Sequence, residues 1–277
     1  MDSCQSCGAL DPEWQPLYHD LALFSCPACQ SFSFFSEAPF DAAAVYSRPY
    51  FEGGEYADYV GHRRAHEVSF REKWAILSRH LCGETRLLEV GCAYGLFVGF
   101  ARDQGVREVL GLDVSADAID FATRTFGPHF AVSVDGTHPA FAYNCLVAWD
   151  VWEHLPRPLA YFARLVADLD PGGLFAVATV DSSSWVARHR GRRWRQIHPP
   201  THLHHPTFNA MRSAMRGLGL ETLYHGHVGQ HRALETYLAP LGLGRIVRRF
   251  ETLRTLPVPL DLGDYQLIVA RKPKASS

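Results

Sequence analysis

The sequence predicts an α/β protein, in which helices cover both faces of an open sheet and a small cysteine-rich module comes first. Three observations lead to this fold class. Short apolar runs alternate with helical stretches, a glycine-containing turn joins one apolar run to a helix, and two Cys-x-x-Cys pairs lie near the N-terminus. A chain of 277 residues can hold one large domain and such an appendage. We expect a zinc-binding module at 1–38, a connecting helical segment at 39–81 and the large domain at 82–277.

The composition is that of a folded globular protein. Hydrophobic residues make up 47% of the chain and charged residues 20%, and a net charge of -2 gives no general attraction to nucleic acid or to an anionic membrane. No apolar run is long enough to cross a bilayer, and the first residues do not resemble a secretory signal. Seven cysteines in such a chain indicate a reducing compartment, so we expect a cytoplasmic protein.

Four cysteines near the N-terminus have the spacing of a structural zinc site. Cys4 and Cys7 form one pair and Cys26 and Cys29 the other, with two residues inside each pair and eighteen between the pairs. Two tight turns can then aim four thiolates at one ion, and the apolar residues between them are too few to fold without a metal. We expect a zinc ribbon that holds structural Zn²⁺. Disulfides and a redox dithiol are the alternatives.

Aromatic residues are dense in the connecting segment: Tyr46, Tyr50, Phe51, Tyr56 and Tyr59. We assign Tyr50 to a substrate-binding site, and ordinary packing of the cluster is the alternative. Apolar residues then recur at intervals of four, three and four, namely Phe70, Trp74, Leu77 and Leu81. This spacing predicts one face of a helix that packs against the sheet.

The large domain begins with a strand, a glycine-containing turn and a helix. Arg86 to Val90 is a short apolar strand, Gly91 to Gly95 form the turn, and Leu96 to Gln104 fit a helix. Small residues in such a turn let a ligand approach the backbone closely. Glu108 to Leu112 predict a second strand, and an acidic residue at its end, Asp113, is placed to reach ribose hydroxyls.

Further motifs give these elements a family resemblance. Leu88 to Gly95 have the form Glu-x-Gly-x-x-x-Gly, the strand Cys145 to Trp149 runs into a Glu-His-Leu signature, and Pro171-Gly172-Gly173 precede the strand Leu174 to Val180. The chain thus resembles class I methyltransferases of the type 11/23 group over about two thirds of its length. That resemblance implies a Rossmann-like sheet with helices on both faces, and S-adenosylmethionine (SAM) as cofactor.

The resemblance also implies roles for particular residues. The methionine end of the cofactor would meet Glu89, Gly91 and Gly95, with Ala93 standing where many relatives have glycine. Asp113 would bind the ribose. Asp135, after the predicted strand Phe130 to Val134, would approach the adenine, and a simple turn residue is the alternative. Trp149 and Asp150 would line the floor beneath the sulfonium.

The acceptor should lie beyond the carboxyl ends of the strands, next to 150–158 and to a substrate loop at 181–206. This loop is rich in arginine, and we assign Arg192, Arg193 and Arg195 to acceptor binding. Guanidinium groups suit phosphate, so we expect a phosphate-bearing acceptor such as a nucleotide-linked sugar. A solvated basic loop is the alternative.

The same loop supplies candidates for a general base. His202 is the first choice because His202 to Thr207 resemble the family pattern His-Leu-x-x-aromatic-Ser/Thr, with Pro206 in place of the aromatic residue. His198 and His154 are further candidates, and a structural role is the alternative for each. The order Asp150-x-x-Glu153-His154 also resembles a divalent-metal site of some quinone-type O-methyltransferases. Hydrogen bonding of Glu153 and His154 to the following helix and loop is the ordinary interpretation.

The last third of the domain contains a predicted helix, two strands and an insertion. Thr207 can cap a helix from Phe208 to Arg216, and Leu220 to Tyr224 and Tyr265 to Ala270 fit strands. A late insertion at 226–262 is expected to be helical. It would cover the acceptor pocket or form a homodimer contact.

The leading hypothesis is therefore methyl transfer from SAM to a small molecule, by O- or C-methylation of a sugar or secondary metabolite. An rRNA or tRNA methyltransferase is the second hypothesis. The first forty residues contain no Lys or Arg, which makes the cysteine module a poor phosphate binder. A non-catalytic SAM-binding module is the third.

Overall fold

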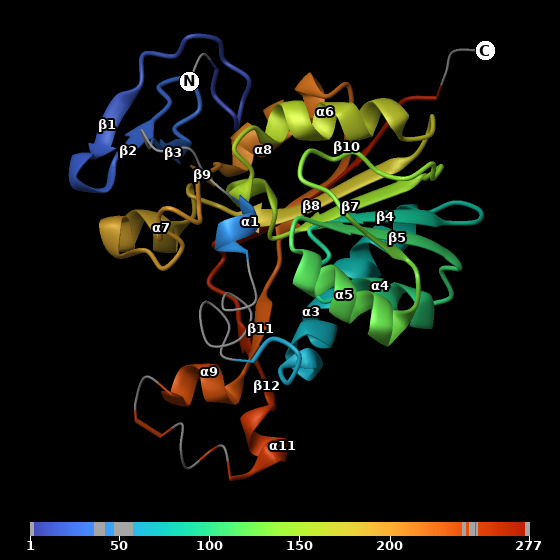
Figure 1. The fold of residues 1–277 in the computed structure, drawn as a ribbon. Helices are drawn as coiled ribbons and strands as arrows, with labels where there is room; N and C mark the ends of the chain where they lie inside the picture. The colour runs from blue at the N-terminus through green and yellow to red at the C-terminus, as the bar shows by residue number, and fades with distance from the viewer. Residues whose placement is uncertain are drawn as a thin grey trace.

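A computed structural model describes residues 3–35, 42–46, 58–239, 242–243, 247 and 249–274. Tyr50, assigned to a substrate-binding site from the sequence, lies outside these residues. Within them, one large sheet forms the centre of the molecule, with helices above and below it (Figure 1). None of the described helices has the length and apolar character that crossing a membrane requires.

The central sheet has seven strands in the order β10-β13-β8-β7-β4-β5-β6. They are β4 (Arg86–Val90), β5 (Glu108–Asp113), β6 (Phe130–Val132), β7 (Cys145–Trp149), β8 (Leu174–Val180), β10 (Glu221–His227) and β13 (Tyr265–Arg271). The strands β8, β7, β4, β5 and β6 are parallel to one another, whereas β13 runs antiparallel to both β8 and β10. The α/β fold class predicted from the sequence is confirmed.

Helices bury both faces of this sheet. The helices α3 (Arg63–Leu77), α4 (Leu96–Asp103) and α5 (Ala116–Phe126) lie on one face, and α6 (Pro158–Asp168) and α8 (Phe208–Gly217) on the other (Figure 1). Because side chains of a strand alternate between faces, Ala176 of β8 packs with the first set and Val177 with the second. Thr207 caps α8 as predicted, since its side chain accepts a hydrogen bond from the Ala210 amide.

The cysteine-rich N-terminus forms a small sheet that reaches into the large domain. Its strands are β1 (Gln15–Tyr18), β2 (Leu23–Ser25) and β3 (Phe32–Phe34), with η1 (His19–Leu21) between the first two. A fourth strand, β9 (His204–His205), comes from the substrate loop and pairs with β3. Thr207 adds hydrogen bonds of 2.9 Å to the Ser31 hydroxyl and to the Cys29 carbonyl. The module and the substrate loop are therefore one packed unit.

The late insertion is only partly helical. Its ends pair as an antiparallel ribbon of β11 (Gln230–Ala233) and β12 (Pro257–Leu260). The short helix α9 (Leu234–Leu238) follows β11, and the short helix α11 (Glu251–Arg254) precedes β12. The expected helix is wrong at these ends because Pro257 and Pro259 cannot donate the hydrogen bonds that a helix interior needs and favour extended backbone instead. The ribbon packs along α3, where the His231 amide donates a 2.8 Å hydrogen bond to Ser69.

Shorter helices complete the fold. They are α1 (Ala42–Val45), η2 (Ser78–His80), η3 (Trp152–His154), α7 (Trp185–Arg190) and η4 (Gly191–Arg193). The helix η3 follows β7 directly, and α7 and η4 belong to the substrate loop between β8 and β9.

Candidate active site

A cavity of about 860 Å³ opens at the carboxyl ends of β4, β5 and β7. Its remaining walls are one face of α3, the ribbon strand β11, helix α9 and the substrate loop. The residues of α3 and its N-cap that line it are spaced by three and four along the helix: His62, Ala65, His66, Ser69, Phe70 and Lys73. This is the place where open α/β sheets bind ligands.

The glycine-containing turn forms the first end of the cavity. Gly91 has φ of +71°, and a Cβ atom there would lie 2.4 Å from a methyl group of Val151. Only glycine therefore fits at this position. Ala93 also takes a positive φ of 46° and lines the cavity. Gly95 does not line it; this residue precedes α4, and its missing Cβ admits the ring of Phe130.

Asp113 lies at the end of β5, beside the turn. One carboxylate oxygen accepts a 2.8 Å hydrogen bond from the Ala93 amide and the other a 2.9 Å bond from the Ser115 amide. Burial raises the pKa of this carboxyl. Asp135, in contrast, is exposed and outside the lining of the cavity, and its carboxylate contacts Thr137 and Arg164. The structure does not bring Asp135 to the other cofactor candidates.

The floor of the cavity contains ionisable side chains, and two of them, Glu89 and Lys73, are almost fully buried. Glu89 is 3% exposed, and its Oε2 atom has no hydrogen-bond partner among the described residues. Burial raises the pKa of Glu89 well above its usual value. Trp149 and Asp150 line the floor beside it. The ammonium of Lys73, from α3, lies 3.8 Å from the Asp150 carboxylate.

Sequence reasoning missed Lys73, although a signal was present. A lysine between Phe70 and Leu77 lies on the face of α3 that packs against the sheet, where a charged side chain is rarely buried without a partner. It also missed the contribution of β11, from which Gln230 donates a 3.1 Å hydrogen bond to Asp150.

Three histidines gather at the second end of the cavity. His154 follows β7 in η3, whereas His198 and His202 belong to the substrate loop, and all three line the cavity. The ring centroid of His202 lies 4.6 Å from that of His154 and 3.7 Å from that of His198. Glu153 is 1% exposed and lines the same end. The structure thus brings together the three base candidates named from the sequence.

Hydrogen bonds to backbone carbonyls fix the tautomers of two of these histidines, His154 and His202. The Nδ1 atoms of His154 and His202 lie 2.9 Å and 2.8 Å from backbone carbonyl oxygens, those of Thr201 and Gln196. A carbonyl can only accept, so each Nδ1 carries the proton. The Tyr46 hydroxyl, also 2.9 Å from Nδ1 of His154, can accept from it as well. In each ring Nε2 is left as the basic nitrogen.

The predicted acceptor arginines lie outside the cavity. Arg192 forms a 2.6 Å ion pair with Asp20 of the N-terminal module, Arg193 is exposed, and Arg195 contacts the buried Asp264 at 3.3 Å. None of these three lines the cavity. The sequence placed them in the correct loop but could not show which way they point. Arg232 of β11 lines the cavity instead.

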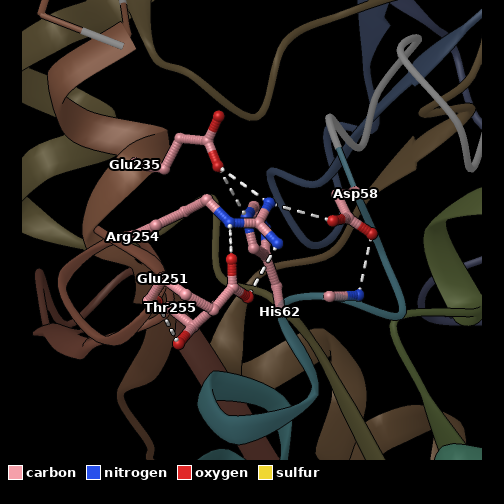
Figure 2. Close-up of polar contacts among 7 residues, drawn as sticks. Asp58, His62, Glu235, Glu251, Arg254 and Thr255 are labelled. Atoms are coloured by element: carbon pink, nitrogen blue, oxygen red, sulfur yellow. Dashed lines mark hydrogen bonds and ion pairs between the residues drawn. The ribbon is translucent and has the colours of Figure 1, made fainter. Parts of the chain in front are cut away.

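A network of charges holds the late insertion against α3 (Figure 2). The guanidinium of Arg254 lies 3.0 Å from Asp58 and 3.3 Å from Glu235, and its Nε donates a 2.9 Å hydrogen bond to Glu251. His62 lies 3.5 Å from the same Glu235 oxygen. His62 and Glu235 both line the cavity, so this network fixes one of its walls.

The four N-terminal cysteines converge in space. Their sulfur atoms all lie within 4.8 Å of one another, and those of Cys4 and Cys29 are 3.8 Å apart. An edge of about 3.8 Å is what a tetrahedron of thiolates around zinc has when each Zn–S bond is about 2.3 Å. The two Cys-x-x-Cys turns also have the same backbone hydrogen bond. The Gly8 amide donates to the Cys4 carbonyl and the Gln30 amide donates to the Cys26 carbonyl, each at 2.8 Å. These residues fit a bound Zn²⁺.

The sheet order, the glycine turn and the cavity beside it define a class I, SAM-dependent methyltransferase. The sequence model of a family described as a methyltransferase domain matches residues 54–225, and the chain belongs to this family. No curated protein matches the chain significantly.

Solved structures share the fold at low sequence identity. A SAM-dependent methyltransferase of Thermotoga maritima, described as a possible histamine N-methyltransferase, has a TM-score of 0.54 and 15% identity, over 80% of this chain and 96% of that one. The YcgJ protein of Bacillus subtilis has a TM-score of 0.54 and 14% identity, over 76% and 100%. The magnesium protoporphyrin IX methyltransferase of Synechocystis, solved with bound SAH, has a TM-score of 0.51 and 13% identity, over 77% and 86%.

Proposed function

We propose that this protein transfers a methyl group from SAM to a small-molecule acceptor, at an oxygen or carbon atom of a sugar, nucleotide-linked sugars included, or of a secondary metabolite. One observation carries the proposal: a single cavity of about 860 Å³ contains both the glycine turn and the histidine cluster. Donor and acceptor can therefore meet inside one enclosed space. The walls formed by α3 and β11 favour a compact acceptor over a nucleic acid.

The first end of the cavity suits the cofactor. Gly91 admits the ligand close to the backbone, and Asp113 is placed to accept hydrogen bonds from ribose hydroxyls because each of its oxygens has a second lone pair. The amino acid part of SAM is a zwitterion. We assign its ammonium to Glu89, whose buried Oε2 has no hydrogen-bond partner in the part of the chain that the structure describes, and its carboxylate to Lys73.

Methyl transfer depends mainly on the alignment of the acceptor with the methyl group. Bound SAM would supply an activated methyl group, and correct placement of the acceptor is worth roughly 7 to 11 kcal/mol. Trp149 and Asp150 support the reacting end from below. An oxygen or carbon acceptor also loses a proton, and the basic Nε2 atoms of the histidine cluster are the groups that can receive it. His202, at the centre of the cluster, remains the first candidate.

An anionic group on the acceptor would meet Arg232 rather than the arginines of the substrate loop. Arg232 is the guanidinium that faces the cavity, whereas Arg192 and Arg195 pair with aspartates elsewhere. A phosphate on the acceptor would then lie beside β11.

We further propose structural Zn²⁺ on Cys4, Cys7, Cys26 and Cys29. The converging sulfurs and the two matching turns support it. Four thiolates complete a tetrahedron, so this ion would stabilise the module without taking part in catalysis. We also propose that the protein is cytoplasmic, because paired cysteines that hold a metal are typical of a reducing compartment.

The proposal is tested by incubating the full chain with methyl-labelled SAM and separate panels of nucleotide sugars, phenolic metabolites and RNA. We expect label in one of the small-molecule panels. Label found only in RNA would replace the small-molecule assignment. Tight SAM binding with no transfer to any panel would favour a non-catalytic binding module.

A further inference from the structure

We propose that Glu153, His154 and His202 bind a divalent transition-metal ion at the histidine end of the cavity, and that an oxygen of the acceptor completes its coordination. The inference rests on the proposed function, because it takes this end of the cavity as the acceptor site. It assigns His154 and His202 as ligands, so His198 replaces His202 as the group that receives the proton.

The three side chains converge from two separate parts of the chain. Glu153 and His154 are neighbours in η3, and His202 comes from the substrate loop, yet one ligand atom from each lies within 4.8 Å of the other two. The Leu203 amide donates a 2.7 Å hydrogen bond to the Glu153 carbonyl, which ties the two segments together. Metal bonds of about 2.1 Å place the ligand atoms of a tetrahedral site about 3.4 Å apart, and small side-chain rotations can supply that contraction.

Both histidines have the orientation that a metal ligand requires. A histidine that binds a metal through one ring nitrogen usually donates the other N–H to a carbonyl or carboxylate. His154 donates Nδ1–H to the Thr201 carbonyl at 2.9 Å, and His202 donates Nδ1–H to the Gln196 carbonyl at 2.8 Å. Two Nε2 lone pairs are thereby held in fixed directions at one end of a cavity.

The carboxylate is held in the same way. The Thr179 hydroxyl donates a 2.8 Å hydrogen bond to Oε2 of Glu153 and fixes the side chain. Glu153 is 1% exposed, and a carboxylate so deeply buried is stabilised by a cation beside it. The neighbouring imidazoles bind a metal in their uncharged form, so they do not supply the positive charge that stabilises Glu153.

The donor set selects the kind of metal. Two imidazoles and one carboxylate suit Zn²⁺, Fe²⁺ or Co²⁺, whereas Mg²⁺ and Ca²⁺ prefer oxygen ligands alone. Three protein ligands leave at least one coordination position open, which is typical of a catalytic site rather than a structural one. This separates the site from the four-thiolate cluster of the N-terminal module.

The open position defines the acceptor as one that binds through a hydroxyl oxygen. Metal binding lowers the pKa of that hydroxyl. The O–H proton passes to Nε2 of His198. Nδ1 of His198 lies 2.6 Å from the Thr201 hydroxyl, which donates its own hydrogen to the His198 carbonyl and therefore accepts from Nδ1–H. An oxygen lone pair then forms the new bond to the methyl carbon of SAM. The C–S bond breaks with its electron pair left on sulfur, and a methyl ether and neutral S-adenosylhomocysteine result.

The test is the metal content of the full-length protein after loading with Zn²⁺ and removal of excess metal. The double variant Glu153→Gln/His202→Gln should hold one equivalent less than the wild type. The control His189→Gln changes an exposed histidine that stacks on Trp185 and should leave the content unchanged. Equal metal content in the double variant and the wild type would overturn the proposal.

Co²⁺ gives a second measurement that does not depend on the variants folding. Wild-type protein loaded with Co²⁺ should show d–d bands of a histidine and carboxylate site besides the thiolate charge-transfer bands of the cysteine cluster. Spectra with the thiolate bands alone would also contradict the inference. Calorimetry of SAM binding separates the two claims. A protein that binds SAM but takes up no second metal ion would end the metal proposal only. A metal-loaded wild type that does not bind SAM would end the proposed function itself.

Discussion

The backbone amide of Ala93 donates a 2.8 Å hydrogen bond to the carboxylate of Asp113. This bond joins the turn after β4 to the end of β5, so Asp113 both shapes the turn and faces the cavity. The residue that we assign to the ribose is therefore also part of the scaffold that positions Gly91. Substitution of Asp113 should therefore weaken cofactor binding more than substitution of any exposed carboxylate nearby.

Asp113→Ala should weaken SAM binding by about 10-fold to 100-fold, because the ribose hydroxyls lose a charged acceptor whose hydrogen bonds contribute roughly 1.5 to 3 kcal/mol. Isothermal titration calorimetry measures the affinity, and thermal unfolding reports the accompanying loss of stability. Asp135→Ala is the matched control: Asp135 is exposed and outside the cavity, so its replacement should leave the affinity unchanged. Equal effects of the two substitutions would remove Asp113 from the ribose role.

Lys73→Met should weaken binding of S-adenosylhomocysteine but not of 5′-methylthioadenosine, which has no amino acid part. The reason is that Lys73 lies by the floor of the cavity, 3.8 Å from Asp150, where we place the methionine carboxylate. A charged hydrogen bond of this kind contributes about 1.5 to 3 kcal/mol, or about 10-fold or more in affinity. If both ligands weaken equally, Lys73 acts only through the fold.

His202→Ala should lower the methylation rate by about 100-fold or more and leave SAM affinity nearly unchanged. His202 lies at the second end of the cavity, and general-base or metal-ligand roles both contribute at this scale. Single-turnover kinetics with saturating SAM measure the step directly. His189→Ala, at an exposed position, serves as the control. Near-normal turnover of the His202 variant would contradict either role.

Arg254→Gln should loosen the wall formed by the late insertion. Glu235 is 1% exposed and would lose its charged partner, at a cost of about 1.5 to 3 kcal/mol. Hydrogen exchange of residues 230–238 should therefore become faster, while exchange in β4 and β7 stays slow. Arg124→Gln breaks an exposed pair with Asp120 and should change neither region. Unchanged exchange near β11 would show that the network of Figure 2 does not fix this wall.

Cys26→Ser should reduce the zinc content and destabilise the substrate loop as well as the module. The loop depends on the module because β9 pairs with β3 and Thr207 bonds to Ser31 and Cys29. Hydrogen exchange at 202–207 should accelerate with that at 23–34, and methylation should fall with it. Cys82→Ser, which changes an exposed cysteine far from the cluster in sequence, should alter neither. Loss of zinc with a fully protected loop would show that the loop is stable by itself.

The sequence predicted the elements that have strong local signals. The strands β4, β7 and β8 have the predicted bounds, because each is a mostly apolar run between turn residues. The strand β11 was missed because its residues, Gln-His-Arg-Ala, have no apolar pattern. They pair with a proline-containing segment far along the chain. Tertiary pairing, rather than local preference, makes that strand.

The candidate site was predictable where the backbone determines it and not where side-chain direction does. Gly91, Asp113 and Asp150 follow from strand ends, which parallel topology brings to one edge of the sheet. The arginines of the substrate loop could not be placed in this way, and Arg192 turns outward to Asp20. Whether a loop residue faces a cavity depends on packing between distant segments, which one sequence does not reveal.

The pairing of β3 with β9 also constrains the order in which the polypeptide acquires its shape during synthesis. The small N-terminal sheet emerges from the ribosome first, but its last strand, His204–His205, is translated some 170 residues after Phe32–Phe34. Until then the edge of β3 is open to other chains, and non-local pairing of this kind is slow to form. Cells that make this protein must keep that edge from aggregating while most of the remaining chain is translated.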